Sequence, residues 1–527
     1  STTYHLLYPP KNVGSGKKNT SFDTFEELFC TFYQANLDEE TTRKSKVLTH
    51  KIREIMIIGR TKEQRELHEA YKSEYSEFAV VYGRLRVGKT FLVRETFNYT
   101  FTFEHSGVAK GNMRVQLRAF RDSLADAGMG KVKIPEDWME AFSLLRQLIR
   151  QSQERKKVVF IDEIPWMDTP HSNFVSAVEY FWNNFASARK DVLLIICGSA
   201  TSWIINKVLK NHGGLHNRVT YRLPVMPFTL HECEQYMRAK KIQASHYDLL
   251  EYYMVFGGVP FYWSLLTRGL SVAQNVDRLI FAEDGKLRYE FNELYDSLFR
   301  NPAKYVSIVM ALGENGSGMT RDELVKQCEL EDNGRTSRML EDLEECGFIR
   351  KIPTYGLKNQ ATFRLIDNYT LFYLKFVKHN TANDEQFWSH NYLSSLRSAW
   401  VGLAFERLCF LHIRQIKMAL GISGVVTNVF AWRVGPSADG KKGAQIDMLI
   451  DRADNMVNIC EMKFSHNEYT VTKDDADNLY HKAERFVAET GCRKSVSITM
   501  VTVAGIAHAG YWSEIHNSIT SEDLFKA

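Results

Sequence analysis

The sequence predicts an α/β protein whose central domain is built around a parallel β-sheet. A short apolar run, Phe78 to Tyr82, is followed by a glycine-containing loop and then by a helical stretch that begins near Phe91. A second apolar run, Val158 to Ile161, ends in the paired carboxylates Asp162 and Glu163. Continuous apolar strands separated by helical segments are typical of a parallel sheet that is covered by helices on both faces.

The loop at residues 83–90, GRLRVGKT, fits the phosphate-binding pattern Gly-x-x-x-x-Gly-Lys-Thr. Gly83 and Gly88 allow the backbone to curl so that its N–H groups, with the N-terminus of the following helix, face phosphate oxygens. Lys89 then bridges the β- and γ-phosphates, and the Thr90 hydroxyl is a ligand for Mg²⁺. We therefore expect ATP and Mg²⁺ as cofactors, with nucleotide contacts from Gly83, Arg84, Val87, Gly88, Lys89, Thr90 and Phe91.

The paired carboxylates extend this prediction from binding to hydrolysis. Asp162 and Glu163 stand at the C-terminal end of a predicted strand, where ligands bind in open α/β sheets. Asp162 is expected to hold Mg²⁺, and Glu163 is expected to polarise the water that attacks the γ-phosphate. Paired acids at a strand end can also cap a helix, and this alternative stays open for the pair taken alone. With the phosphate loop upstream, the two motifs together predict an ATPase.

Composition narrows the class of protein. The chain has 527 residues, which suggests about three or four domains, and 44% hydrophobic and 25% charged residues with a net charge of +4. Such a balance is typical of a soluble protein and gives no global basic excess for nucleic acid. The eight cysteines form no Cys-x-x-Cys pair, and no apolar run reaches membrane-spanning length. These features predict a cytoplasmic protein without a membrane partner.

The string IIGRTKEQREL at residues 57–67 lies just before the phosphate loop. It resembles the box that precedes this loop in AAA-like ATPases of the archaeal-type family, relatives of the signal-transduction ATPases with numerous domains. The loop itself departs from that family's pattern only at Leu85. The resemblance implies that Gly59 and Arg60 border the adenine pocket, and that Gly258 and Pro260 in a helical lid lie near the same base.

The same resemblance implies two further nucleotide-site residues. The apolar run Asp191 to Thr201 matches the strand that carries a γ-phosphate sensor, for which Ser199 is the first choice and Thr201 the reserve. Arg218 is implied as the cation that stabilises transition-state charge, in cis or across a subunit contact. The alternative for Arg218 is a surface arginine without a catalytic role. The alternative for Gly258 and Pro260 is a purely structural Gly-Gly-x-Pro turn.

Residues 301–367 have the pattern of a winged helix-turn-helix, with helices at 303–312, 320–328 and 334–346 and a hairpin at 348–365. The third helix carries Arg335 and Arg338, and the hairpin carries Arg350, Lys351 and Lys358. These cations could contact DNA phosphates. Because the third helix also carries the acids Glu341, Asp342, Glu344 and Glu345, DNA binding and protein packing both remain open for this module.

The C-terminal region carries a second constellation. Glu406 lies on a predicted amphipathic helix, and two predicted strands, 445–451 and 458–463, bring together Asp447, Glu461 and Lys463. Glu461 and Lys463 lie two residues apart and therefore point to the same face of their strand. Carboxylates that hold Mg²⁺ beside a lysine suit metal-dependent phosphodiester cleavage, with Asp447 and Glu461 as the metal ligands. The pattern resembles the restriction-endonuclease-like PD-(D/E)xK fold, although Ile446 stands where that fold has proline.

The resulting hypothesis is a P-loop ATPase that acts as a nucleotide-driven switch coupled to a DNA-binding or DNA-cleaving C-terminal domain. The alternatives are a nucleotide-gated interaction protein whose nuclease-like domain does not cut, and a degenerate nuclease fold used for packing. A homo-oligomer or a regulatory protein is the expected protein partner. The predicted organisation is an arm with an amphipathic helix at 1–50, an ATPase core at 51–226, a helical lid at 227–300, a winged helix at 301–367 and a nuclease-like domain at 368–527.

Overall fold

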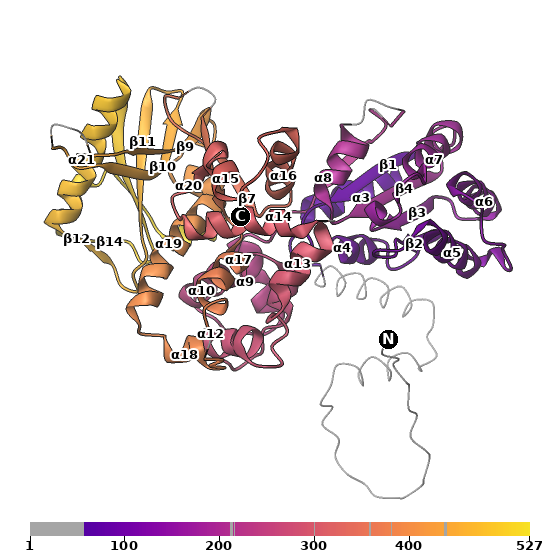
Figure 1. Cartoon of the computed structure of the whole chain (residues 1–527), viewed down its shortest axis with the longest axis horizontal. Helices are drawn as coiled ribbons and strands as arrows, with labels where there is room; N and C mark the ends of the chain where they lie inside the picture. Colours follow the sequence, from indigo (N-terminus) through magenta and orange to yellow (C-terminus); the bar gives the residue numbers. More distant parts are fainter. Residues whose placement is uncertain are drawn as a thin grey trace, which may run out of the picture. The chain divides into compact units, whose positions relative to one another are not determined.

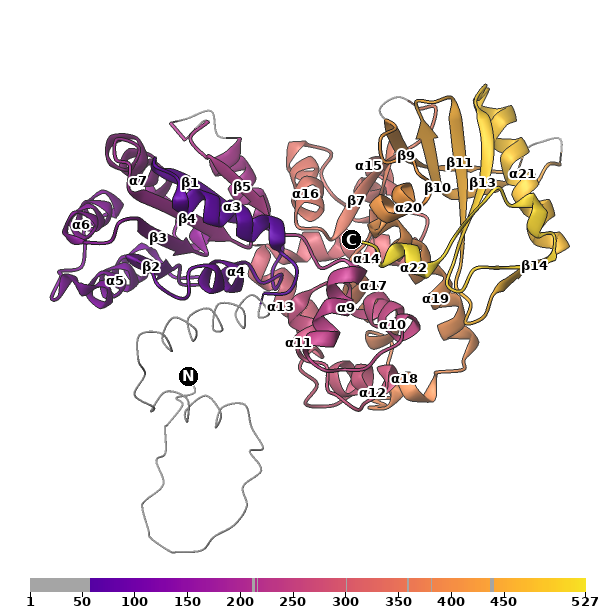
Figure 2. The same ribbon diagram turned by 180° about the vertical axis from the view of Figure 1, so that it is seen from behind.

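A computed structural model describes residues 57–210, 214–215, 217–299, 301–357, 360–380, 382–436 and 440–527 (Figures 1 and 2). The arm and amphipathic helix predicted within residues 1–50 lie outside the described residues, as does Lys358 of the predicted hairpin. Within the described part, the chain from Ile57 to Ala527 forms one compact unit.

The first sheet contains five parallel strands in the order β2-β3-β4-β1-β5. The bounds are β1 Glu77–Tyr82, β2 Phe103–Ser106, β3 Lys157–Asp162, β4 Val192–Gly198 and β5 Tyr221–Pro224. Every residue of β3 and β4 is buried, as the apolar runs predict. Because β4 lies between β1 and β3, the C-terminal ends of these three strands stand side by side, and the predicted phosphate loop and carboxylates follow them directly.

Helices cover both faces of this sheet, as Figures 1 and 2 show. Helices α3 (Thr61–Lys72) and α4 (Lys89–Thr96) pack on one face; α5 (Met113–Leu124), α6 (Trp138–Gln151) and α7 (Phe174–Phe181) pack on the other. The sequence predicts a mostly helical segment from 91 to 155, but β2 lies within it as an edge strand paired only with β3. Its four residues and the polar His105 and Ser106 give too short an apolar run to be recognised as a strand.

Residues 230–298, which the sequence assigns to a helical lid, are mostly helical, and the short helix α8 precedes β5. The helices are α8 Thr201–Ile204, α9 Leu230–Ala239, α10 His246–Phe256, α11 Pro260–Ser264, α12 Val272–Val276 and α13 Glu290–Leu298. The Gly-Gly-x-Pro sequence forms the turn between α10 and α11: Gly257 ends α10 with a left-handed φ of 59°, and Pro260 is the first residue of α11. Proline suits that first position because its missing N–H is not needed there.

The next segment contains three helices and a small antiparallel sheet in the order β6-β8-β7. The bounds are α14 Pro302–Glu314, β6 Met319–Thr320, α15 Arg321–Gln327, α16 Gly334–Glu345, β7 Ile349–Pro353 and β8 Ala361–Leu365. Thr320 caps α15 by accepting a hydrogen bond from the Glu323 N–H, as its sequence position predicts. The three predicted helices and the predicted hairpin are therefore present.

The C-terminal region is built on a mixed five-stranded sheet in the order β15-β13-β11-β10-β9. Strands β9 and β11 flank β10 in antiparallel register, and β13 and β15 continue the sheet in parallel with β11. The helices of this region are α17 Asn368–Phe372, α18 Phe387–His390, α19 Ser395–Leu411, α20 Ile413–Ala419, α21 Lys473–Thr490 and α22 Ser521–Leu524. Its strands are β9 Thr427–Val434, β10 Ala444–Arg452, β11 Met456–Lys463, β12 Tyr469–Val471, β13 Ser495–Thr502, β14 Ile506–Gly510 and β15 Asn517–Ile519. Single 3₁₀ or π turns occupy Ala125–Met129, Ile164–Trp166, Trp182–Ala186, Ile205–Leu209, Asp277–Phe281, Tyr373–Val377 and Trp512–Glu514.

The hydrophobic core does not stop at the predicted boundaries after residues 300 and 367. One cluster of buried side chains extends from Phe228 to Phe525 and includes residues of the lid helices, the small sheet and the C-terminal region. The hairpin contributes to a second junction, because Tyr355 packs against Phe430 and Phe486 with ring centroids 5.3 and 4.9 Å apart. These three predicted segments thus share contiguous packing.

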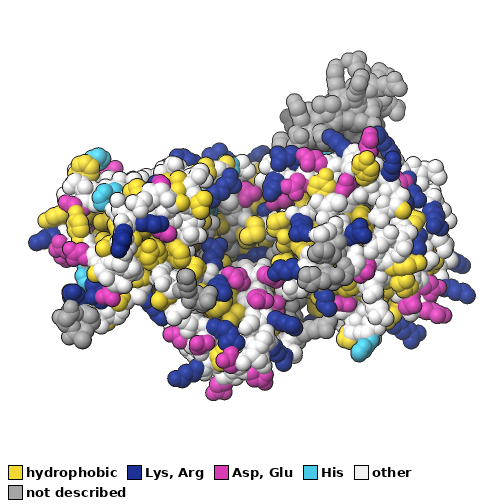
Figure 3. Space-filling view, turned by 90° about the horizontal axis from the view of Figure 1, so that it is seen from above, with side chains coloured by type: hydrophobic (Ala, Val, Ile, Leu, Met, Phe, Trp, Pro, Cys, Tyr) yellow, Lys and Arg dark blue, Asp and Glu magenta, His cyan; other side chains and the backbone are white. Residues whose placement is uncertain are grey.

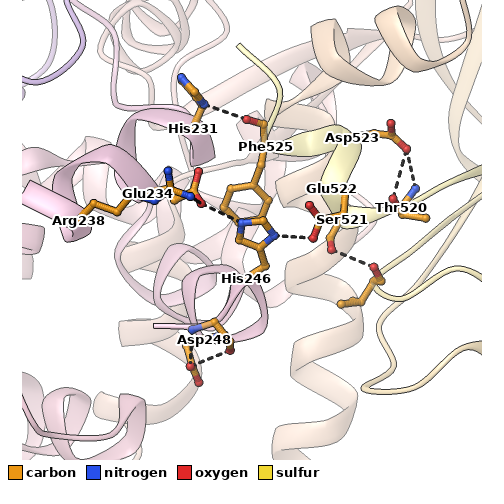
Figure 4. Close-up of polar contacts among 12 residues, drawn as sticks. His231, Glu234, Arg238, His246, Asp248, Thr520, Ser521, Glu522, Asp523 and Phe525 are labelled. Carbon is orange, nitrogen blue, oxygen red and sulfur yellow. Dashed lines mark hydrogen bonds and ion pairs between the residues drawn. The ribbon is translucent and has the colours of Figure 1, made fainter. Parts of the chain in front are cut away.

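The C-terminal helix α22 and Phe525 dock against α9 and α10 around His246 (Figure 4). The His246 ring contacts a carboxylate oxygen of Glu522 at 2.6 Å through Nδ1 and one of Glu234 at 3.0 Å through Nε2, and it stacks on Phe525. Burial alone lowers the pKa of His246, but the two carboxylates outweigh it, so the pKa lies above its ordinary value. When it is protonated, the His246 ring pairs with carboxylates of both α22 and α9.

The surface carries no dominant charge on the face shown in Figure 3, where Lys and Arg side chains are interspersed with Asp and Glu. The seven cysteines of the described residues are all free. Across the same part of the chain, no helix combines the length and the apolar composition that crossing a bilayer requires.

Candidate active site

The backbone of the phosphate loop requires both of its glycines. Gly83 has a φ of +150°, and a Cβ placed on it would lie 2.2 Å from the Val225 carbonyl oxygen, so no side chain fits. Gly88 has a left-handed φ of +85° and precedes the first residue of α4. A Cβ on Gly88 would meet no other part of the chain within 4 Å, so its left-handed backbone rather than close packing favours glycine there.

A chain of hydrogen bonds connects the phosphate loop to the ends of β3 and β4. The Lys89 ammonium group donates to the Arg84 carbonyl at 2.8 Å and to the Ser199 hydroxyl at 3.2 Å. The Ser199 hydroxyl in turn donates to a Glu163 carboxylate oxygen at 2.6 Å. Ser199 is the first residue after β4 and Glu163 the first after β3, so the order of strands brings the predicted lysine, sensor and general base together.

Thr90 and Asp162 form the second contact between the loop and β3. The Thr90 hydroxyl donates to Asp162 Oδ2 at 2.6 Å, while Asp162 Oδ1 accepts from the Glu163 N–H at 2.9 Å. Asp162 is buried and Glu163 has a left-handed φ of 46°. The Thr90 hydroxyl and the Asp162 carboxylate are neighbouring oxygen ligands, which fits the preference of Mg²⁺ for hard oxygen atoms.

The predicted adenine-side residues also lie beside the loop. The Arg60 guanidinium donates to the Val87 carbonyl at 3.4 Å and stacks 4.9 Å from the centre of the Phe228 ring. A Cβ on Gly258 would lie 1.9 Å from the Phe228 carbonyl oxygen, so close packing explains this glycine. The role of Gly59, Gly258 and Pro260 in binding the base stays a prediction.

One predicted nucleotide contact, Arg84, has its side chain engaged by another partner. The Arg84 side chain, predicted to contact nucleotide, instead forms a buried ion pair with Asp367, with 2.5 Å between Nη1 and Oδ1. Only the backbone of Arg84 remains for a phosphate. The reason is a distant partner: Asp367 caps α17, 283 residues downstream, and sequence spacing does not reveal it.

Arg86, the other arginine of the loop, has a similar role that the sequence did not indicate. It pairs with Glu290 and, at 3.1 Å, with Glu293 of α13, and its guanidinium lies 4.5 Å from the centre of the Phe261 ring. Burial raises the pKa of Glu290 to about 7 despite a hydrogen bond from Tyr262 and the nearby Arg86. The phosphate loop is thus tied to the lid region by ion pairs.

Three other predicted residues lie away from this hydrogen-bonded chain. Arg218 is exposed in the turn before β5, and among the described residues its side chain joins no contact of this site. Phe91 is exposed on α4, and Thr201 is buried at the first turn of α8. The predicted roles of Arg218 and Phe91 are therefore untested, and Ser199 rather than Thr201 contacts Lys89.

The C-terminal carboxylates meet where α19 packs on the second sheet. Asp447 precedes Met448, whose partner on β11 is Cys460, so Asp447 and Glu461 occupy neighbouring positions beside a bulge in β10. Burial, together with the nearby carboxylates of Asp447 and Glu461, raises the pKa of Glu406 to about 7. Three acidic side chains from three elements are therefore close enough to interact electrostatically.

Two members of this carboxylate cluster, defined as Glu406, Asp447 and Glu461, also face cations. Lys463 and Lys482 lie 3.2 and 2.7 Å from the two carboxylate oxygens of Glu461. Arg364 of β8 lies 3.5 Å from Asp447. No three His, Cys, Asp or Glu side chains of the described residues are grouped so as to hold a metal ion, so Asp447 and Glu461 as metal ligands stay a prediction.

The sequence identified Lys463 through its spacing from Glu461, but missed Lys482 and Arg364. Lys482 comes from α21, where a lysine on a helix of mixed charge carries no distinctive signal. Arg364 was visible only as a cation of the predicted hairpin strand. A search for basic residues on the helix after a Glu-x-Lys strand could have suggested Lys482.

The predicted DNA-contacting residues divide into two groups. Arg335 and Arg338 are exposed on α16, while Asp342 and Glu344 are engaged by the Tyr305 hydroxyl and the Lys351 N–H. Arg350, by contrast, donates to the Phe410 carbonyl at 3.2 Å and belongs to the junction with α19. This bond ties Arg350 to α19, and its predicted contact with DNA stays a prediction.

The parallel sheet, the phosphate loop and the carboxylates at the ends of its strands define a nucleotide-binding domain of the P-loop class. Residues 57–266 match the family model described as an ATPase domain predominantly from Archaea. This part of the chain is an ATP-binding ATPase domain.

Two kinds of comparison extend beyond that segment. An uncharacterized protein of Methanocaldococcus jannaschii is 26% identical over 360 residues, which are 67% of this chain and 76% of that protein. Among solved structures, the Walker-type ATPase of Pyrococcus abyssi has 17% identity and a TM-score of 0.46, covering 60% of this chain and 96% of its own. The ORC2 protein of Aeropyrum pernix, in its ADPNP-ADP complexes, has 13% identity and a TM-score of 0.37, covering 60% and 93%.

Proposed function

We propose that the protein is a Mg²⁺-dependent ATPase that works as a nucleotide-driven switch. The observation that carries this proposal is the hydrogen-bonded chain from Lys89 through Ser199 to Glu163. It joins a phosphate-binding lysine, a polar side chain suited to sensing the γ-phosphate and a carboxylate suited to polarising water. Since these groups follow three adjacent strands, they are held in place by a buried sheet rather than by mobile loops.

Each group has a role that its chemistry supports. Lys89 exchanges its contacts with Arg84 and Ser199 for phosphate oxygens, and Glu163 then becomes free to orient the attacking water. Thr90 and Asp162 would hold Mg²⁺, which when bound neutralises charge that develops on the phosphates. Arg218, exposed before β5, is proposed to reach a nucleotide across a contact between subunits.

For the C-terminal region we propose a phosphodiester-cleaving site on DNA that nucleotide state controls. The support is the convergence of Glu406, Asp447 and Glu461 with two lysines, which suits metal-dependent cleavage. The observation that favours a non-cleaving interaction domain is that cations already face Asp447 and Glu461. Both candidates retain the same ATP-driven switch.

The module at residues 301–367 is proposed to be a winged helix with a divided role. Its hairpin packs against the C-terminal region through Tyr355 and Arg350, which supports the packing role. Its helix α16 leaves Arg335 and Arg338 exposed, which supports contact with DNA phosphates. An interaction of this kind is electrostatic and falls with increasing salt concentration.

One experiment separates the two candidate functions. ATP hydrolysis and Mg²⁺-dependent cleavage of plasmid and single-stranded DNA are measured for the intact protein and for Lys89→Ala, Glu163→Gln and Glu461→Ala. We expect Lys89→Ala to lose ATP binding and Glu163→Gln to bind ATP but hydrolyse it at least about 100-fold more slowly. Glu461→Ala should lose DNA cleavage and keep ATP hydrolysis.

The outcomes are distinct. If Glu163→Gln hydrolyses ATP at the rate of the intact protein, the assignment of the general base is wrong. If no DNA is cut under any nucleotide while ATP is hydrolysed, the non-cleaving interaction protein replaces the nuclease. Asp474→Asn on the exposed first turn of α21 provides a matched control, because it removes a carboxylate of the same region without touching the cluster.

A further inference from the structure

The segment Arg364–Asp367, which we call the linker segment, contacts both predicted sites. At one end, the Asp367 carboxylate pairs with Arg84 of the phosphate loop at 2.5 Å. At the other end, the Arg364 guanidinium lies 3.5 Å from Asp447 in the carboxylate cluster. Four consecutive residues thus reach from the nucleotide site to the C-terminal site.

The nucleotide end of the linker segment is sensitive to phosphate contacts. The Arg84 carbonyl accepts a hydrogen bond from Lys89, the residue that must turn to the phosphates when nucleotide binds. The Arg84 side chain is 6% exposed and the Asp367 side chain 3% exposed. Separating such a buried pair would leave an isolated charge, which is strongly unfavourable, so the two residues are expected to move together.

The linker segment is also stiff. The Phe348 carbonyl accepts hydrogen bonds from the Ile366 and Asp367 N–H groups, at 2.8 and 3.2 Å. Leu365 is buried and pairs with Ile349 on β7. Asp367 caps α17 by accepting from the Thr370 N–H at 2.9 Å. The linker segment is therefore held along its backbone and at its side chain, so it would shift as a unit rather than bend.

The cluster end holds Arg364 in a confined place. Gly318 has a left-handed φ of +86°, and a Cβ there would lie 2.7 Å from Arg364 Cγ, so the stem of the arginine rests against the backbone of the loop before β6. The Arg364 side chain is 15% exposed, and its Nε is buried without a hydrogen-bond partner. A small cavity lined by Arg364, Glu406 and Arg407 lies beside it.

We infer that the linker segment transmits the nucleotide state to the carboxylate cluster, with Arg364 as the blocking cation. While Arg364 faces Asp447, its charge opposes the entry of a second cation such as Mg²⁺. When phosphate contacts draw Lys89 away from the Arg84 carbonyl, the coupled pair of Arg84 and Asp367 shifts and moves Arg364 relative to Asp447. This inference rests on the proposed function, because it needs ATP to bind at the loop.

Thermodynamic linkage gives a test that needs no DNA. If nucleotide changes the contact of Arg364 with Asp447, then removing that contact must change nucleotide affinity by the same coupling factor. We compare the dissociation constants of ATP and ADP for the full chain and for Arg364→Gln. The ratio of the two constants should change by about fivefold or more. In the background of Asp367→Asn, which disconnects the linker segment from Arg84, Arg364→Gln should leave the ratio unchanged.

Lys494→Gln is the matched control. It breaks the ion pair of Lys494 with Asp451, 2.7 Å long, on the same sheet but outside the linker segment. A second readout is amide hydrogen exchange of β10: ATP and ADP should protect it differently in the full chain and equally in Arg364→Gln. This readout keeps the test valid if the double variant does not fold.

The possible failures differ from each other. If ATP binds normally but Arg364→Gln leaves both the affinity ratio and the exchange of β10 unchanged, the inference is wrong and the ATPase proposal stands. If Lys494→Gln changes the ratio of the ATP and ADP dissociation constants as much as Arg364→Gln does, the inference is also wrong. The effect would then not be specific to the linker segment. If the intact chain binds no ATP, the proposed function itself fails.

Discussion

Replacing Asp367 with asparagine tests the buried ion pair on which the linker segment depends. Asparagine has the shape of aspartate and retains a side-chain oxygen that can accept from the Thr370 N–H, so the cap of α17 is preserved. What disappears is the negative charge opposite Arg84, which is buried and has two further nitrogen atoms without hydrogen-bond partners. The change therefore isolates the charge of a buried guanidinium.

The magnitude follows from that burial. Removing one partner of a buried ion pair destabilises a protein by about 3–5 kcal/mol. The lower value corresponds to a factor on the order of 100 in the equilibrium between closed and open forms. Amide hydrogen exchange measures this factor locally, and the Leu371 N–H, which donates to the Asp367 carbonyl, is the amide to follow.

A surface ion pair provides the comparison. Asp332 pairs with Arg321 at 2.5 Å, but its side chain is 71% exposed. Asp332→Asn should cost less than about 1 kcal/mol and accelerate exchange of neighbouring amides by less than about fivefold. If Asp367→Asn changes exchange of α17 no more than Asp332→Asn changes exchange near α16, the Arg84 pair is not energetically important and our reasoning about the linker segment is wrong.

Two further predictions concern pH and DNA. Because folding raises the pKa of His246, its contacts with the C-terminal segment stabilise the protein fully below pH about 6.5 and are lost as the pH rises through the raised pKa. His246→Gln should therefore lower the melting temperature more at pH 6 than at pH 8. A decrease of the same size at both pH values would contradict this. Charge reversal of the exposed Arg335 and Arg338 should weaken DNA affinity and reduce the dependence of that affinity on salt. Fluorescence anisotropy between about 50 and 200 mM salt measures both effects. Unchanged affinity would remove α16 from the DNA-binding surface.

The phosphate loop shows how much of the site could be predicted from the sequence. The residues that act together in the loop, Gly83, Gly88, Lys89 and Thr90, lie close to one another in the sequence. Their positions relative to one another in the structure therefore follow from their sequence spacing. The strand ends that carry Asp162 and Ser199 were also recognised, because each follows a long apolar run. Their direct contacts with Thr90 and Lys89, however, depend on the strand order, which places β4 between β1 and β3.

Side-chain partners from distant segments mark the limit of such prediction. Arg84 belongs to the loop pattern, yet its side chain binds Asp367, and Arg86 binds Glu290 more than two hundred residues away. Likewise, the sequence did not indicate that the hairpin cation Arg350 donates to a carbonyl of α19. A long cationic side chain has many acceptors within reach, and sequence alone does not say which of them the fold brings near.

The sequence by itself therefore determined features that arise over a few neighbouring residues: the long apolar strands, the phosphate loop and the alternation that aligns Glu461 with Lys463. Only the tertiary structure decided which of these elements contact one another. The small sheet at residues 319–365 lies between the two predicted sites, and its last strand directs Arg364 to one and leads into Asp367 at the other. The physical reason is that ion pairs and buried contacts depend on distance in space, which local sequence patterns do not encode.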